Sequence, residues 1–279
     1  MTWSGCRTRR HTRRQPRYGS ASMHTARHAA LYGLGRLEEA DEEYRTIEGL
    51  CPAVLDRAEA TAVQVLSLTQ RTRFADAIGL GIGSLRELGI VVPPPDQLTA
   101  DLDRQFGYLH RWLDHTDAAD DLARPDLTDP ALLAASGLID AVLPAAYFAA
   151  DRATNSWLSL EALRIWLEHG RGPTLVGPAG NAAVAVVVLR GDYAAGYRAA
   201  RRILALSEAR GWEPGTRSTT SASTGPTIFS STRTSRSSAP TSPNLTATAR
   251  LARIAPQADD PAHAAAGCWP SPRCATRPA

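Results

Sequence analysis

Lysine is absent from the 279-residue sequence, so all 31 basic residues are arginines. A phosphate-binding loop of the G-x-x-x-x-G-K-[ST] type, the strand lysine of a protein kinase and a Schiff-base lysine all require an amine that this chain lacks. The sequence therefore excludes these three kinds of chemistry. The same bias, with abundant Ala, Gly and Pro, is typical of a GC-rich genome.

Cysteines and long apolar runs are also scarce. The four cysteines, Cys6, Cys51, Cys268 and Cys274, match neither a C-x-x-C zinc site nor a disulfide framework. The longest apolar run, residues 182–189, is too short to span a bilayer. No apolar stretch follows the N-terminal arginine pairs, as a signal peptide would require. We therefore expect a soluble, cytoplasmic protein without a membrane segment.

The charge is distributed unevenly along the chain. Residues 1–30 carry seven arginines and no acid, and residues 213–279 carry seven arginines against three acids. Residues 31–212 carry seventeen arginines against twenty-five acids, a net charge of −8. With 43% hydrophobic residues, the chain can bury a sizeable core. The sequence predicts an acidic globular region between basic ends.

Three segments share one helical design. The stretch "LGRLEEADEEYRTI", residues 34–47, places apolar side chains at helical spacing after a Gly-Arg start, and residues 72–90 and 190–210 repeat the arrangement. In each, a bulky apolar residue is followed three positions later by a small one, which lets two helices approach closely. The residues expected to pack between repeat units are Leu37, Ala40, Tyr44, Phe74, Ala77, Ile78, Tyr193, Gly196 and Tyr197.

The spacing of these segments predicts a repeat protein. Gly35 and Thr72 are 37 residues apart, and Gly191 follows after 119 more, about three further periods of roughly forty. Residues 57–70 supply an earlier helix that packs on the one beginning at Arg73. We therefore predict an all-α, tetratricopeptide-like helical solenoid of about eight helices in residues 26–212, between disordered ends.

The region between the second and third segments reads as helices with longer joints. Three prolines shortly after Gly89 end the helix that precedes them, and Asp96 can cap the next helix. Pro144 bends or interrupts a later helix, and Gly170 ends the one after it. The Val-rich residues 180–190 fit either a strand or a buried helix, and the helical surroundings favour the helix. Helices are predicted over residues 97–115, 131–150 and 153–170.

The stretch "LPAAYFAADRATNSWLSLEALRIWLEHGRGP", followed by "LRGDYAAGYRAARRILALSEARG", resembles the helical-repeat region of large bacterial signalling ATPases. In that family a Ser/Thr kinase-like domain, an ATPase domain, a tetratricopeptide-like region and sensor histidine kinase modules occur on one polypeptide. The resemblance covers about residues 28–212. The matching positions are Leu143, Pro144, Tyr147, Phe148, His169, Gly170, Gly191, Asp192, Tyr193, Gly196 and Tyr197.

This resemblance implies a non-catalytic role, because none of the matching positions is a catalytic residue of the family. The implied function is a scaffold that contacts protein partners or other domains of a signalling assembly, with no cofactor and no metal. The segment "LVGPAGNAAVAV" departs from the family pattern. An alternative is a truncated fragment of the parent ATP-binding kinase or histidine kinase, which should still bind nucleotide. A piece cut from a longer array is also expected to self-associate through its exposed apolar end.

The two ends differ from the middle. We predict a disordered basic arm over residues 1–25 and a disordered tail over 213–279, where nineteen of the first thirty-six residues are Ser or Thr. The tail composition also fits a shifted reading frame. The arginine-rich ends raise a third functional hypothesis, non-specific nucleic-acid binding. No nucleic-acid-binding motif accompanies them, so the sequence favours an accidental basic end.

The sequence gives little indication of metal ligands or catalytic bases among its histidines and aspartates. His24 and His28 share a helix face but lack a third metal ligand. His110 and His115 lie near four aspartates, Asp114, Asp117, Asp120 and Asp121, which favour a solvated polar loop over a cation site. His169 suits the last turn of a helix through the helix dipole alone. The sequence therefore predicts no catalytic, metal or cofactor residue.

Overall fold

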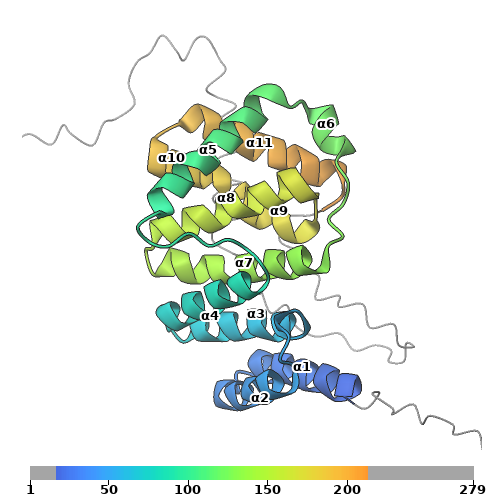
Figure 1. The fold of residues 1–279 in the computed structure, drawn as a ribbon. Coiled ribbons are helices and arrows are strands. Elements are labelled where there is room, and N and C mark those ends of the chain that lie inside the picture. Colours follow the sequence, from blue (N-terminus) through green and yellow to red (C-terminus); the bar gives the residue numbers. More distant parts are fainter. Residues whose placement is uncertain (1–16, 213–279) are drawn as a thin grey trace, which may run out of the picture.

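The computed structural model describes residues 17–212, and helices cover most of them (Figure 1). No strand occurs within this range, where one isolated bridge joins Asp126 to Arg171. The all-α prediction is confirmed. The helices are α1 (Arg17–Gly33), α2 (Leu37–Leu50), α3 (Val54–Gln70), α4 (Phe74–Glu87), α5 (Leu98–His115), α6 (Ala118–Ala123), α7 (Pro130–Phe148), α8 (Arg152–His169), α9 (Pro173–Gly180), α10 (Ala182–Arg190) and α11 (Tyr193–Ala209).

Four helical hairpins form the frame: α1/α2, α3/α4, α7/α8 and α9–α10/α11. The first helix of each hairpin contacts the first helix of the next, and each second helix also contacts the first helix that follows it. Helices α9 and α10 are separated only at Asn181, three residues after Pro178, whose ring removes a backbone donor. Figure 1 shows the hairpins stacked from α1/α2 at one end to α10/α11 at the other.

The turn inside each hairpin has one backbone form. A residue with positive φ lies two positions before the second helix: Gly35 (72°), Thr72 (60°), Ala150 (57°) and Gly191 (67°). In the first three hairpins the next residue donates its N–H to the carbonyl five positions earlier, which is the closing bond of a left-handed helix end. These bonds are Arg36 N to Leu31 O (3.0 Å), Arg73 N to Leu68 O (2.9 Å) and Asp151 N to Ala146 O (3.0 Å).

Ala150 occupies this left-handed position without the freedom of glycine, and it is exposed. The left-handed conformation costs an L-residue roughly 1–2 kcal/mol. We therefore expect Ala150→Gly to raise the free energy of unfolding by on the order of 1 kcal/mol, measured by urea denaturation. Ala149→Gly is the matched control because Ala149 has right-handed angles, φ −70° and ψ −6°; it should lower stability. Equal effects of the two substitutions would contradict the common turn.

The residues that begin the second helices fall into two pairs. In α2 and α4 an arginine precedes the helix and bonds to an acid three residues later, Arg36 to Glu39 (2.6 Å) and Arg73 to Asp76 (2.7 Å). In α8 and α11 an aspartate caps the helix instead. The caps are Asp151, which accepts from Thr154 N (3.0 Å), and Asp192, which accepts from Ala195 N (2.9 Å). Neighbouring hairpins therefore resemble each other most.

Helices α5 and α6 form an insertion between the second and third hairpins. The chain leaves α4, and α5 then packs on α8 and α11 rather than continuing the stack. This insertion corrects the predicted three further periods: only one hairpin, α7/α8, lies between α4 and the last hairpin. Asp96 does not cap α5; Gln97 occupies the cap position and makes no side-chain cap bond.

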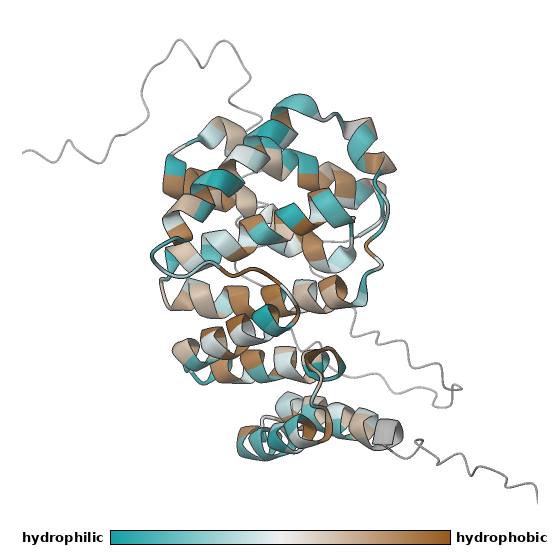
Figure 2. Ribbon diagram, in the orientation of Figure 1, coloured by the Kyte–Doolittle hydropathy of each residue, from teal (hydrophilic) through white to brown (hydrophobic). Residues whose placement is uncertain are grey.

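The main core is centred on α7 and α8. Trp157 and Trp166 of α8 are 1% and 0% exposed. Helix α7 continues through Pro144, so the predicted interruption is wrong. Packing against α3, α4, α8 and α9 offsets the bond that proline cannot donate. Figure 2 shows the contrast between the mostly hydrophobic α7 and the mostly hydrophilic α2.

Two stretches of the described chain are long and apolar enough to cross a membrane by length and composition: Pro130–Phe148 and Pro173–Arg190. The sequence predicted neither. Half of the first window and 56% of the second are buried against other helices. A core helix of a folded domain has the same composition.

The first hairpin joins the rest through a small core and a polar network. Tyr44 and Ile47 of α2 and Cys51, directly after it, pack with Ala60 of α3 as a separate cluster. Four hydrogen-bonded pairs surround it: His24 with Glu43 (2.5 Å), His28 with Gln64 (3.1 Å), Gln64 with Asp41 (2.6 Å) and Arg71 with Asp41 (2.7 Å). Helix α1 begins at Arg17, so the predicted disordered arm over 1–25 is wrong from that residue onward. Residues 1–16 and the 213–279 tail lie outside the described residues.

The network makes stability depend on pH through His28, which is fully buried. Burial lowers the pKa of His28 below its ordinary 6.5, although the bond to Gln64 opposes this. Stability is therefore complete above the unfolded pKa and is lost as pH falls toward the lower folded pKa, by at most about 1.4 kcal/mol per pH unit. The charged and titratable groups that act on or contact His28 are Asp41, Glu43 and Tyr44 of α2. His24 of α1 bonds to Glu43, and Arg71, directly after α3, bonds to Asp41.

Urea denaturation at pH values from 7, above the ordinary histidine pKa of 6.5, down to 5 tests this. We expect His28→Gln to lose less stability than the parent protein as the pH falls. His169→Gln is the control because His169 lies in the exposed last turn of α8. If the free energy of unfolding falls equally with pH in His28→Gln and in the parent protein, His28 is not the source of the pH dependence.

Candidate interaction site

The residues predicted to pack between repeat units differ in how deeply they are buried. Ala40 and Ala77 are 0% exposed, and Gly196 is also buried. Tyr44 is 5% exposed, and its hydroxyl lies 3.0 Å from Thr61 Oγ1 of the next hairpin. Four others are partly buried. Phe74 and Ile78 pack against the main core, and Leu37 and Tyr197 are half-buried.

Tyr193 is the exception, with 71% of its surface exposed. It is the first residue of α11, beyond Arg190, where the facing helix α10 ends. The predicted packing role of Tyr193 is therefore wrong. The buried stripe of α11 begins instead at Ala195 and Gly196.

Gly196 lies at a close contact between α10 and α11. A Cβ placed there would be 2.9 Å from Ala183 O and 2.5 Å from Val187 Cγ2. Because one of these atoms is backbone, even Gly196→Ala should lower the free energy of unfolding, by about 1–2 kcal/mol, and Gly196→Leu by about 3 kcal/mol. The sequence alone favoured a mild or stabilising alanine through helix propensity. Gly137→Ala, within α7 with no atom within 4 Å of its Cβ, is the control; equal thermal melting of all variants would contradict the contact.

The histidines considered as metal ligands are each hydrogen-bonded to a different side chain. His24 bonds to Glu43, and His28 bonds to Gln64. His110 donates from Nδ1 to Phe106 O (2.8 Å), and its Nε2 lies 3.1 Å from Asp192 Oδ2; both contacts favour the protonated ring and raise the pKa of His110. Within residues 17–212 no group of three or more His, Cys, Asp or Glu side chains is placed to hold a metal.

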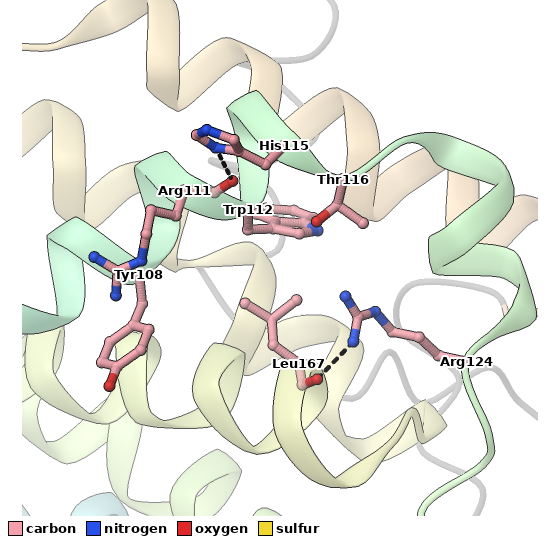
Figure 3. Close-up of a pocket in the computed structure, with 7 residues that line it drawn as sticks. All are labelled: Tyr108, Arg111, Trp112, His115, Thr116, Arg124 and Leu167. Carbon is pink, nitrogen blue, oxygen red and sulfur yellow. Dashed lines mark hydrogen bonds between the residues drawn. The ribbon is translucent and has the colours of Figure 1, made fainter.

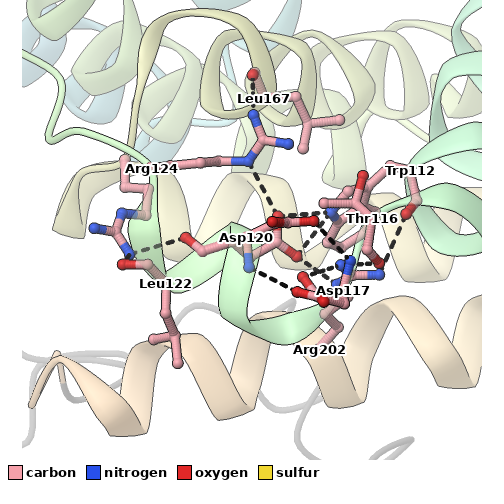
Figure 4. A network of polar contacts seen from close by, with 10 residues as sticks. Trp112, Thr116, Asp117, Asp120, Leu122, Arg124, Leu167 and Arg202 are labelled. Atoms are coloured by element: carbon pink, nitrogen blue, oxygen red, sulfur yellow. Dashed lines mark hydrogen bonds and ion pairs between the residues drawn. The ribbon is translucent and has the colours of Figure 1, made fainter.

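Asp121 is fully buried, which corrects the prediction of a solvated loop at this position. Its two oxygens accept from Trp112 Nε1 (3.0 and 3.1 Å), from Arg124 Nε (3.1 Å) and from Arg202 Nε of α11. Figure 4 labels these three partners within the polar network. Asp117 and Asp120 do lie on the surface, where they form a capping box at the start of α6. Asp121 therefore ties the insertion to α11.

Arg171 also supports the insertion. Its side chain is 1% exposed, and its Nη1 donates to the carbonyls of Asp121 and Leu122, both at 3.0 Å. Burial lowers the pKa of Arg171. Its sequence neighbours in "EHGRGP" gave no sign of this role, because the carbonyls it binds are about fifty positions away.

A hollow of about 330 Å³ opens beside this network, between α5 and α8 (Figure 3). Leu167 forms part of its apolar wall, and Trp112 and Tyr108 supply rings. The residues that line it are Tyr108, Arg111, Trp112, His115, Thr116, Arg124 and Leu167. No carboxylate side chain is among these lining residues.

A second surface feature is a cluster of exposed rings at the turns of neighbouring hairpins. Tyr147 and Phe148 are 51% and 55% exposed. The Phe148 ring stacks on Phe74 with centroids 6.1 Å apart, and the Tyr147 ring meets it edge-on at 5.4 Å. Aromatic rings are enriched at protein interfaces.

Neither family models, nor curated proteins, nor solved structures give a match to this chain. The geometry therefore carries the functional argument. The two candidate contact surfaces are the hollow between α5 and α8 and the exposed rings around Phe148.

Proposed function

We propose that this chain is a non-catalytic, tetratricopeptide-like scaffold that binds protein partners in bacterial signal transduction. The observation that carries the proposal is the stack of hairpins, each with a left-handed residue in the turn between its two helices. Stacked helical units generally present extended surfaces for binding other chains. The insertion α5–α6 adds a hollow to one side of this stack.

Binding to protein suits both candidate surfaces. Exposed, clustered rings such as Tyr147 and Phe148 gain hydrophobic free energy when a partner covers them. The hollow combines rings, an aliphatic wall and arginines, which are residue types enriched at interfaces. The absence of lysine supports a role outside nucleotide chemistry of the lysine-dependent kinds.

Selection from a random peptide display library against the full chain tests the proposal. We expect peptides that bind with one-to-one stoichiometry and protect described helices from hydrogen exchange. Equilibrium dialysis with ATP tests the alternative of an enzyme fragment. Nucleotide binding without recovered peptides would overturn the scaffold proposal.

A further inference from the structure

The hollow between α5 and α8 is lined by cationic groups on opposite sides. Figure 3 shows the side chain of Arg111 at one side, beside Tyr108, and that of Arg124 at the other, with Leu167 between them. His115 lies above Trp112 and adds a third nitrogen-bearing group. An anion placed between the two guanidinium groups would meet donors without meeting a carboxylate of the lining.

Arg111 is a positioned cation with donor capacity to spare. Its guanidinium lies 4.5 Å from the centroid of the Tyr108 ring, and this cation–π contact orients it. Among residues 17–212 it makes no ion pair. A guanidinium held in this way can form a bidentate bond with a carboxylate.

Arg124 is fixed more firmly on the other side. Its Nη1 donates to Leu167 O at 2.6 Å, and its Nε donates to the buried Asp121 at 3.1 Å. These bonds engage Nε and Nη1 and leave Nη2 without a protein acceptor among the described residues. Because the Asp121 network holds the side chain in place, binding an anion here costs little conformational entropy.

We infer that this hollow binds a glutamate or aspartate side chain of a partner polypeptide, with an adjacent aliphatic side chain against Leu167 and Trp112. The inference rests on the proposed scaffold function and names the chemistry of the partner. The volume of about 330 Å³ admits one or two side chains. Nucleic acid fits less well, because residues 31–212 carry a net charge of −8 and would repel an extended polyphosphate.

Fluorescence anisotropy with the full chain tests this inference. The probe is a labelled peptide of alternating Glu and Leu, and the control peptide has Gln in place of Glu. We expect the Glu peptide to bind more tightly, and Arg111→Gln to weaken it at least about tenfold. Arg45→Gln, at an exposed arginine of α2, is the matched control and should leave affinity unchanged. The arginine-rich ends are the same in all these proteins, so the difference between variants reports the hollow.

Hydrogen exchange should locate the bound Glu peptide at the C-terminal end of α5. Equal affinity for the Glu and Gln peptides, or an unchanged affinity in Arg111→Gln, would overturn the inference. Competition by oligothymidine that responds to Arg111→Gln would assign the hollow to nucleic acid instead. If library peptides bind elsewhere with an affinity that Arg111→Gln does not change, the scaffold proposal is supported and the inference of an acidic ligand is overturned.

Discussion

Replacing Asp121 by alanine should lower the free energy of unfolding by about 3–5 kcal/mol. The carboxylate is fully buried, and its partners, Trp112, Arg124 and Arg202, are all donors. Removing it takes a shared acceptor from two guanidinium groups and an indole N–H. Breaking a buried pair costs more than a surface pair because the remaining charge loses both water and partner.

Two substitutions make the Asp121 result specific. Asp121→Asn keeps one oxygen but loses the charge, so we expect a smaller loss. Asp120→Asn changes an exposed neighbour in the same short helix and should cost about 1 kcal/mol at most. Urea denaturation followed by circular dichroism measures all three. A loss for Asp121→Ala no larger than that for Asp120→Asn would contradict the buried network.

Local patterns predicted the hairpins well. The segments beginning at Leu37, Phe74 and Tyr193 are the second helices of three hairpins, because helical spacing of apolar residues is a local property. The glycines at Gly35 and Gly191 also mark two of the turns. The two helices of the third hairpin were predicted over 131–150 and 153–170, but the left-handed conformation of Ala150 was not, because no glycine marks it.

The candidate site could not be predicted in the same way. Asp121 meets Arg202 across 81 positions of sequence, and the hollow pairs α5 with Leu167 of α8. Nothing in the spacing of "TDAADDLARPD" separates the buried Asp121 from its exposed neighbours. The spacing of the repeats does not reveal the insertion either. The two helices of the insertion take up nearly the same length of chain as the one further hairpin that the spacing predicted. Long-range packing therefore decided what the local pattern left open.

Gly170 should be the most sensitive glycine in the connection between α8 and α9. Its φ of 124° and ψ of 175° fall in a region that is essentially restricted to glycine, at a cost of about 1–3 kcal/mol for other residues. A Cβ there would also lie 2.8 Å from Pro125 O and 3.0 Å from Leu127 N. Both are backbone atoms, so no side-chain rotation relieves the clash.

Gly170→Ala is therefore expected to lower the free energy of unfolding by about 3–5 kcal/mol, since strain and clash add. To admit the methyl group, the chain at 125–127 must move away from Arg171. The bonds Leu127 N to Arg171 O (2.6 Å) and Arg171 N to Pro125 O (3.0 Å) would then be lost. Gly172→Ala is the matched control, because Gly172 has extended angles and its nearest neighbour atom would be 3.8 Å from the new Cβ. Urea denaturation that finds both glycine variants equally stable would show that the 125–127 segment does not pass over Gly170.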